Sequence, residues 1–151
     1  AFQVFTVPTI NGGVNFKDEN GNNWIEEYIV HPPTHILNGF MWGLWGVYDY
    51  VLQFNDEKAI TLFKQYIRTL VKELDSYDNG FWSLYEHSGT WLKMIASSFY
   101  HKLHIVQLRV MYELTSENIF KLAGNRKGSF IPCGSGTWKP CLYFKRFRRF
   151  G

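Results

Sequence analysis

Two carboxylic acids and a phenol stand side by side in the segment Trp24-Ile25-Glu26-Glu27-Tyr28. In an extended strand, Trp24, Glu26 and Tyr28 would share one face and Ile25 and Glu27 the other, so each face would carry a carboxylate. Such groups take up and release protons in general acid–base catalysis. Spacing alone favours the simpler interpretation of a solvated strand end, because charged side chains are mostly exposed.

A second set of polar groups lies on a helix that we expect to begin near Ser97 or Ser98 and to end near Leu114. Four side chains spaced i, i+4, i+7 and i+11 share one line of this helix, and its polar members can face a cavity together. A histidine in such a place is, by itself, more often a packing residue. The polar line consists of Tyr100, His104, Gln107 and Met111, and the expected apolar line consists of Phe99, Leu103, Val106 and Val110.

These groups need elements to position them, and the most apolar helix of the chain follows Pro32-Pro33, with Thr34 as its expected N-cap. It has almost no polar face, so protein must surround it. Asn38 is polar on this helix and must find partners inside. Three glycines at i, i+4 and i+7 form one line along which we expect a neighbouring backbone to pack closely. They are Gly39, Gly43 and Gly46.

The segment before this helix is expected to be mostly extended. Residues 2–8 alternate in polarity and end at a proline, which predicts an edge strand. An Asn-Gly pair within residues 18–22 predicts a hairpin between short apolar runs. This hairpin should deliver Glu27 and Tyr28 to the mouth of the apolar helix.

After the apolar helix, an amphipathic second helix should begin near Asn55 or Asp56 and pack antiparallel to the first, because the link is short. A turn at residues 78–80 opens a short hairpin or extended loop. A short fourth helix capped by Ser116 should end at residues 124–125, where Gly-Asn is a stop signal.

The fold class expected from these elements is mainly α with a small β portion. Alternating buried and amphipathic helices in antiparallel pairs predict a partial α/α toroid, an incomplete α/α barrel, with β-hairpins at one end. We expect residues 1–124 to form the helical domain and residues 125–151 a basic tail containing glycine and cysteine. Absent partner helices would leave apolar surface for a second subunit or for further sequence to cover.

Composition excludes some classes of function. A net charge of +3 is too small to argue for nucleic acid. The uncharged run between Asn38 and Asp49 is too short for a membrane span, which needs ~20 residues. The two cysteines, Cys133 and Cys141, lack the further ligands of a zinc site, and a disulfide and free thiols remain equal alternatives. No apolar leader is expected at Ala1.

Three ordered segments resemble the C-terminal domain of the D-glucuronyl C5-epimerase family. Together they are far more specific than any one of them, and the similarity extends over roughly residues 4–123. They are Glu26-Glu27-Tyr28 with Pro33, Leu37-Asn38-Gly39-Phe40 and Gly46-Val47-Tyr48-Asp49; Tyr77-Asp78-Asn79-Gly80 with Leu84-Tyr85-Glu86; and Tyr100-His101-x-x-His104-Ile105-x-Gln107-Leu108.

The resemblance implies inversion at C5 of a hexuronic acid, from D-glucuronate to L-iduronate, in a glycan of the heparosan type. It implies a uronic acid polysaccharide as partner, no cofactor and no metal. The implied catalytic residues are Glu27, Tyr28, Tyr85 and Tyr100, with Tyr85 or Tyr100 as acid or base on one face of the sugar, Glu27 on the other and Tyr28 orienting the carboxylate. The implied substrate-binding residues are Trp24, Glu26, Asn38, His104 and Gln107.

The chain departs from the family pattern after Tyr85, where the family has Asp and then Arg, and this chain has Glu86 and then Ser88. The lost guanidinium is a natural clamp for a carboxylate. Two other functions stay open: a non-catalytic glycan-binding helical module, and a uronate lyase, which would share the proton abstraction. The resemblance implies the Golgi lumen for a eukaryotic source, and the cytoplasm or secretion for a prokaryotic one.

Overall fold

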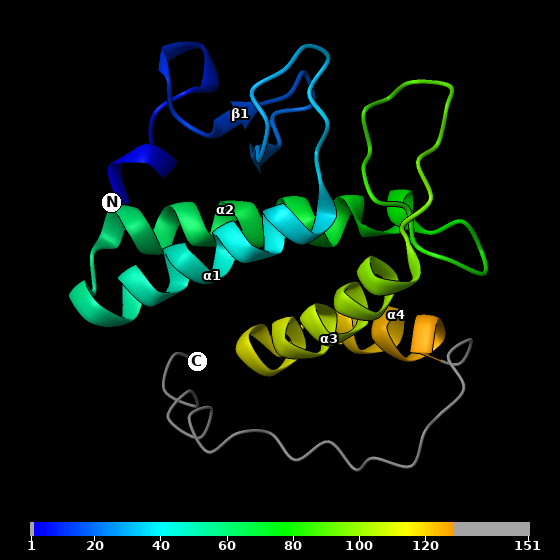
Figure 1. Cartoon of the computed structure of the whole chain (residues 1–151). Coiled ribbons are helices and arrows are strands. Elements are labelled where there is room, and N and C mark those ends of the chain that lie inside the picture. Colours follow the sequence, from blue (N-terminus) through cyan, green and yellow to red (C-terminus); the bar gives the residue numbers. More distant parts are fainter. Residues whose placement is uncertain (1, 129–151) are drawn as a thin grey trace.

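The structure, a computed structural model, describes residues 2–128. Within these residues two antiparallel helical pairs lie beneath a small β-hairpin (Figure 1). Helix α1 (Leu37–Phe54) packs beside α2 (Glu57–Glu73), and α3 (Ser98–Thr115) packs beside α4 (Asn118–Gly128). The two pairs meet where α1 contacts α3. The prediction of a mainly helical fold with a small β portion is therefore confirmed.

The first residues fold as 3₁₀ turns, with η1 at Phe2–Phe5 and η2 at Thr9–Asn11. The predicted edge strand is wrong. The backbone N–H and the hydroxyl of Thr6 both donate to the carbonyl of Gln3, at 3.0 and 2.8 Å. Local bonds of this kind compete with a strand ladder, and Pro8 has no N–H to contribute to one.

The predicted hairpin is present as β1 (Asn15–Lys17) paired antiparallel with β2 (Asn23–Ile25). The carboxylate of Asp18 fastens its turn, accepting from the backbone N–H of Asn22 at 2.8 Å and from the indole N–H of Trp24 at 3.0 Å. Burial alone would raise the pKa of Asp18, but these hydrogen bonds lower it below its ordinary value. The turn therefore also fixes the indole of Trp24.

The start of α1 differs from the prediction. The helix begins at Leu37 without a side-chain cap, so Thr34 is not the N-cap. The N–H of Leu37 instead donates to the carbonyl of Tyr85 at 3.1 Å, and His35 adopts a positive φ of 47°. A loop carbonyl therefore satisfies the first turn in place of a hydroxyl. For α2, Asp56 is the N-cap as predicted, and it accepts from the N–H of Ala59.

The glycine line of α1 faces the hairpin and the N-terminal turn. A Cβ added at Gly39 would collide with the carboxylate of Glu27 and lie 3.1 Å from its Cβ, and one added at Gly43 would lie 2.8 Å from a methyl of Ile25. The same line was expected to admit a neighbouring backbone. The structure corrects this, because side chains and not backbone make the close approach.

Helix α3 buries the line that was expected to face a cavity. His104, Gln107 and Met111 are fully buried, whereas Phe99 on the expected apolar line is 67% exposed and Val106 is also exposed. The predicted apolar face of α3 is therefore wrong at Phe99 and Val106. The polar side chains can be buried because they are hydrogen-bonded there, as described below.

Helix α4 continues to Gly128, so the predicted end at residues 124–125 is wrong. Gly124 is buried, and a Cβ added to it would lie 3.6 Å from the Cβ of Leu108 on α3. An added Cβ would make ordinary van der Waals contact there, and this glycine lies within α4 and does not terminate it. Cys133 and Cys141, with most of the expected tail, lie outside the described residues.

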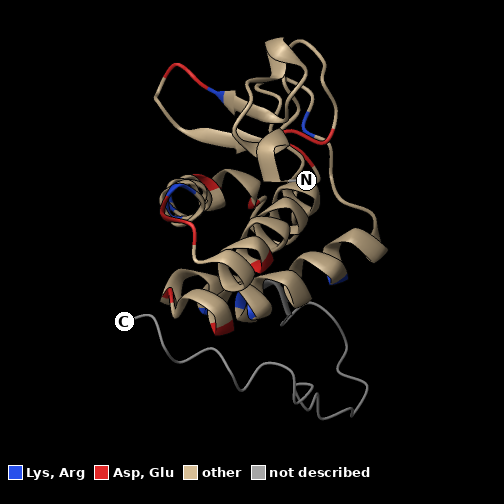
Figure 2. Ribbon diagram, turned by 90° about the vertical axis from the view of Figure 1, so that its left-hand side faces the viewer, with Lys and Arg blue, Asp and Glu red and all other residues tan. Residues whose placement is uncertain are grey.

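Between η3 (Leu74–Tyr77) and α3 the chain forms an extended loop, as expected, with isolated bridges from Asp78 to Ser83 and from Leu84 to Ile95. Elsewhere, basic and acidic positions mix over the outer side of α2 and over α3 and α4 (Figure 2). No helix among residues 2–128 has the length and apolar character that a membrane crossing requires.

Candidate active site

Two tyrosines from separate elements meet at one end of the helices. Tyr85 lies in the extended loop, where its N–H donates to the carbonyl of Met94 at 2.8 Å and its carbonyl accepts from Leu37 of α1. Tyr100 lies in the first turn of α3, which Ser97 caps. The ring centroids of Tyr85 and Tyr100 are 4.8 Å apart and the rings are inclined by 60°. Through Tyr85 the loop therefore contacts the first turn of α1 and the first turn of α3.

Glu27 and Tyr28 follow β2 and are exposed. The side chain of Glu27 lies over Gly39, in the first turn of α1, where the missing Cβ leaves room for it. The Glu27 carboxylate and the Tyr28 phenol both lie close enough to influence the ionisation of Tyr85. The structure thus brings together all four residues predicted to be catalytic.

The electrostatics of Tyr85 reflect this grouping. Burial raises the pKa of Tyr85 to about 12, assisted by the negative charge of Glu27, by Tyr100, which also hydrogen-bonds to it, and by Tyr28. A phenol with this pKa is fully protonated near neutral pH. Tyr85 is therefore suited to donate a proton and not to act as a resting base.

Trp24 and Glu26, two of the predicted substrate-binding residues, lie inside the fold, 1% and 3% exposed. The Glu26 carboxylate accepts from the backbone N–H of His35 at 3.1 Å and pairs closely with its imidazole Nδ1. Trp24 stacks on the same imidazole with ring centroids 4.1 Å apart. In this structure both residues hold His35 in place, and neither presents a surface to a sugar.

The carbonyl of His35 accepts a hydrogen bond of 2.6 Å from the hydroxyl of Tyr77, which is fully buried. Burial and the nearby carboxylate of Glu26 raise the pKa of Tyr77 well above its ordinary value, so it stays a donor. The bond fixes the entry to α1 against the end of α2. Sequence reasoning assigned no role to His35, and its unusual φ gives no signal in the sequence.

The substitution Tyr77→Phe tests this bond. It leaves the carbonyl of His35 buried without its donor, so we expect the free energy of unfolding to fall by about 1–3 kcal/mol. Urea unfolding followed by circular dichroism measures this change. Tyr112→Phe is the control, because the Tyr112 ring is only partly buried on α3. An equal loss in both variants would contradict the role of Tyr77.

Asn38, Gln107 and His104, the remaining predicted substrate-binding residues, are also interior. The side-chain amide of Gln107 donates to the backbone carbonyl of Asn38 at 3.1 Å, which links α3 to α1. The Nδ1 of His104 lies 2.9 Å from the hydroxyl of Ser83. The side chains of Gln107 and His104 are thus hydrogen-bonded to other parts of the protein, and Ser83 is a further residue that sequence reasoning did not single out.

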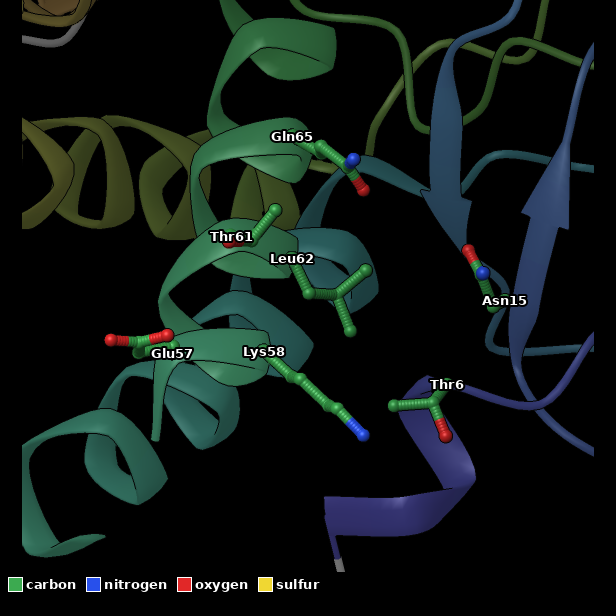
Figure 3. A pocket seen from close by; sticks show the side chains of 7 residues that line it. All are labelled: Thr6, Asn15, Glu57, Lys58, Thr61, Leu62 and Gln65. Atoms are coloured by element: carbon green, nitrogen blue, oxygen red, sulfur yellow. The ribbon is translucent and has the colours of Figure 1, made fainter. Parts of the chain in front are cut away.

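A hollow of about 400 Å³ lies elsewhere, between the N-terminal turns, β1 and α2. It contains none of the predicted site residues, and its side chains come from Thr6, Asn15, Glu57, Lys58, Thr61, Leu62 and Gln65 (Figure 3). We place the candidate site at the tyrosines and not here, because none of the residues that match the family's catalytic groups lines this hollow. Among residues 2–128 no set of three or more His, Cys, Asp or Glu side chains could hold a metal ion.

Comparisons with known proteins identify the family of this chain. The D-glucuronyl C5-epimerase of Caenorhabditis elegans is 28% identical over 141 residues, which cover 83% of this chain and 23% of that protein. An uncharacterized protein of Methanocaldococcus jannaschii is 27% identical over 123 residues, 80% of this chain and 39% of that protein. The chain thus spans well under half of either relative. The pattern of the D-glucuronyl C5-epimerase C-terminus matches residues 1–128, and the chain belongs to that family.

Proposed function

We propose that this chain forms the acid–base site of an epimerase that inverts C5 of hexuronic acid residues in a polysaccharide, D-glucuronate to L-iduronate. The observation that carries the proposal is the grouping of Glu27, Tyr28 and Tyr100 around the phenol of Tyr85, whose pKa they and burial raise to about 12. A carboxylate and a neutral phenol from different elements supply the base and the acid that inversion requires.

The chemistry follows from the acidity of the substrate. The C5 hydrogen lies next to a carboxylate, so its removal adds negative charge to a group already charged. Glu27 takes the C5 proton, and the electron pair moves into the substrate carboxylate. Tyr85 then donates its phenolic proton to C5 from the opposite face, and the electron pair returns to carbon. Exchange with water restores Glu27 and Tyr85, and the sugar gains and loses no atoms overall.

Two further tyrosines and the first turns of two helices assist this reaction in the proposal. Tyr28 orients the substrate carboxylate, and Tyr100, hydrogen-bonded to Tyr85, is the alternative acid. The first turns of α1 and α3 both lie beside Tyr85, through Leu37 and Tyr100. The positive ends of helix dipoles favour nearby anions by about 0.3–1 kcal/mol each. They offer partial compensation for the arginine that the family has and that Ser88 replaces here.

We further propose that the four helices form part of an α/α toroid. The packing of one antiparallel pair beside the other, through contacts of α1 with α3, supports this proposal. Side chains on α2 and α1, among them Phe63 and Val51, line a hollow of about 400 Å³. A second subunit or further sequence of the longer protein would cover this apolar surface.

Heavy water distinguishes the three candidate functions. The full chain is incubated with a heparosan-like oligosaccharide in heavy water, and mass and near-ultraviolet absorbance are followed together. An epimerase adds deuterium without new absorbance. A lyase expels the C4 substituent and produces an absorbing unsaturated uronate. Binding measured by calorimetry without either change would identify a glycan-binding module and would overturn the proposal.

The pKa of Tyr85 gives a test that needs no activity. In Glu27→Gln one source of negative charge is gone, so the pKa should fall from about 12 toward the ordinary value of about 10, though burial keeps it above that value. Because the folded pKa is raised, the stability gained from neutral Tyr85 is present below pH 10 and lost as pH rises through about 12.

Nuclear magnetic resonance of ¹³Cζ-tyrosine, assigned with Tyr85→Phe, measures this titration. Glu19→Gln is the matched control, since Glu19 is an exposed carboxylate in the turn between β1 and β2. An unchanged Tyr85 titration in Glu27→Gln would show that the charge of Glu27 does not influence the pKa of Tyr85, and it would remove the basis of the proposed mechanism.

A further inference from the structure

A compact hydrogen-bonded cluster is formed by residues next to the two tyrosines in the chain. Ser83 is fully buried, and its hydroxyl lies 2.9 Å from the Nδ1 of His101 and 2.9 Å from the Nδ1 of His104. Its backbone N–H also donates to the Nδ1 of His101 at 3.2 Å. Both histidines are themselves fully buried on α3. One loop serine is thus held by two successive turns of the helix.

These contacts constrain where the protons lie. Because the N–H of Ser83 is a donor, the Nδ1 of His101 must be an acceptor and must lack a proton. Every contact then pairs a donor with an acceptor if the Ser83 hydroxyl donates to His101 and the Nδ1–H of His104 donates to the hydroxyl. The hydroxyl is therefore the group that connects the two imidazoles, and no apolar side chain can take its place.

The cluster is connected to the phenols through the backbone on both sides. Ser83 lies two residues before Tyr85, and His101 directly follows Tyr100. Trp82 stacks on the imidazole of His101 with centroids 3.8 Å apart, and its indole donates to the carbonyl of Ala96 at 2.7 Å. The strand-like segment at 82–85 is therefore fastened to α3 at one end, while the bond from Leu37 fastens it to α1 at the other.

We infer that Ser83, His101 and His104 are positioning residues that set the distance between the phenols of Tyr85 and Tyr100. The rings of the two tyrosines contact each other at a centroid separation of 4.8 Å, and the hydrogen bonds of Ser83 hold the loop to α3 two residues before Tyr85. Catalysis depends steeply on such placement, since a displacement of about 1 Å can lower a rate by about 10²-fold. The cluster does not touch substrate in this assignment.

The substitution Ser83→Ala removes the hydroxyl and keeps the backbone bond to His101. We expect the Tyr85 titration to move from about 12 toward its ordinary value, because Tyr85 loses burial and its contact with Tyr100. For C5 exchange, we expect kcat to fall by about 10²-fold with KM nearly unchanged. The kinetic part rests on the proposed function, whereas the titration does not.

Thr69→Val is the matched control. Thr69 is 3% exposed, and its hydroxyl accepts from the N–H of Asn23 at 3.1 Å and donates to the carbonyl of Gln65, both away from the tyrosines. It should lose stability through the same kind of buried hydroxyl while leaving the Tyr85 titration unchanged. Measurements are made at temperatures where circular dichroism shows each variant folded.

A second pair of variants keeps the test decisive if Ser83→Ala does not fold. His104→Asn retains a polar atom near the position of Nδ1, and His104→Leu does not. We expect His104→Asn to keep the wild-type titration of Tyr85 and His104→Leu to shift it. The inference is overturned if Ser83→Ala and His104→Leu titrate at Tyr85 as the wild type does. If Ser83→Ala shifts the Tyr85 titration but the wild type shows no C5 exchange, the proposed function is refuted and the positioning role stands.

Discussion

Glu27→Gln and Tyr85→Phe are each expected to lower the rate of C5 hydrogen exchange by about 10²–10⁴-fold, the usual contribution of a positioned acid or base. The glutamine keeps the size of Glu27 over Gly39 but cannot accept the C5 proton. The phenylalanine keeps the ring that packs on Tyr100 but has no proton to give. Mass spectrometry of oligosaccharide incubated in heavy water measures both rates.

Two exposed or peripheral positions serve as controls for these variants. Glu19→Gln removes a carboxylate from the hairpin tip, and Tyr112→Phe removes a phenol from α3 far from the loop. Both should exchange C5 hydrogen at the wild-type rate. If Glu27→Gln and Tyr85→Phe retain wild-type exchange as well, the assignment of base and acid is wrong.

Gly39→Ala is expected to separate stability from activity. Alanine is favoured over glycine within a helix by up to about 1 kcal/mol, so α1 itself should not be weakened. The added Cβ, however, would occupy the position of the Glu27 carboxylate and force that side chain to move. We therefore expect exchange to fall by about 10²-fold, as for a displaced catalytic group, with little change in the thermal unfolding midpoint.

Gly46→Ala is the matched control on the same line of α1. There an added Cβ would lie 3.7 Å from the ring of Phe5, which is ordinary van der Waals contact. Gly46→Ala should gain a similar amount of helix propensity and should exchange the C5 hydrogen at the wild-type rate. If Gly39→Ala exchanged as fast as Gly46→Ala, the carboxylate of Glu27 would not need its place over the first turn of α1.

The sequence was sufficient for the elements whose signals are local. The Asn-Gly turn of the hairpin and the Asp56 cap each depend on neighbours within a few residues, and each was found where predicted. The grouping of Glu27 and Tyr28 with Tyr85 and Tyr100 was reached through the family resemblance. No spacing in the chain indicates that a loop after α2 returns to the first turn of α1.

Two of the errors, on α3 and at the start of α1, have a common physical cause, which is that distant groups satisfy the polar atoms. The line with His104 and Gln107 was expected to face a cavity, but Ser83 and the carbonyl of Asn38 supply partners that allow it to be buried. Thr34 had the right chemistry for a cap, yet a carbonyl from residue 85 took that role. Such partners are distant in sequence, and periodicity carries no information about them.

The origin of the hydrogen at C5 of the product tests the central claim most directly. If Glu27 removes a proton from one face and Tyr85 supplies another from the opposite face, each residue inverted in heavy water in a single turnover must carry deuterium at C5. Mass spectrometry of the isolated L-iduronate product measures this, and we predict one deuterium per inverted residue. Inverted product that retains its original hydrogen would contradict a two-sided site formed by these residues.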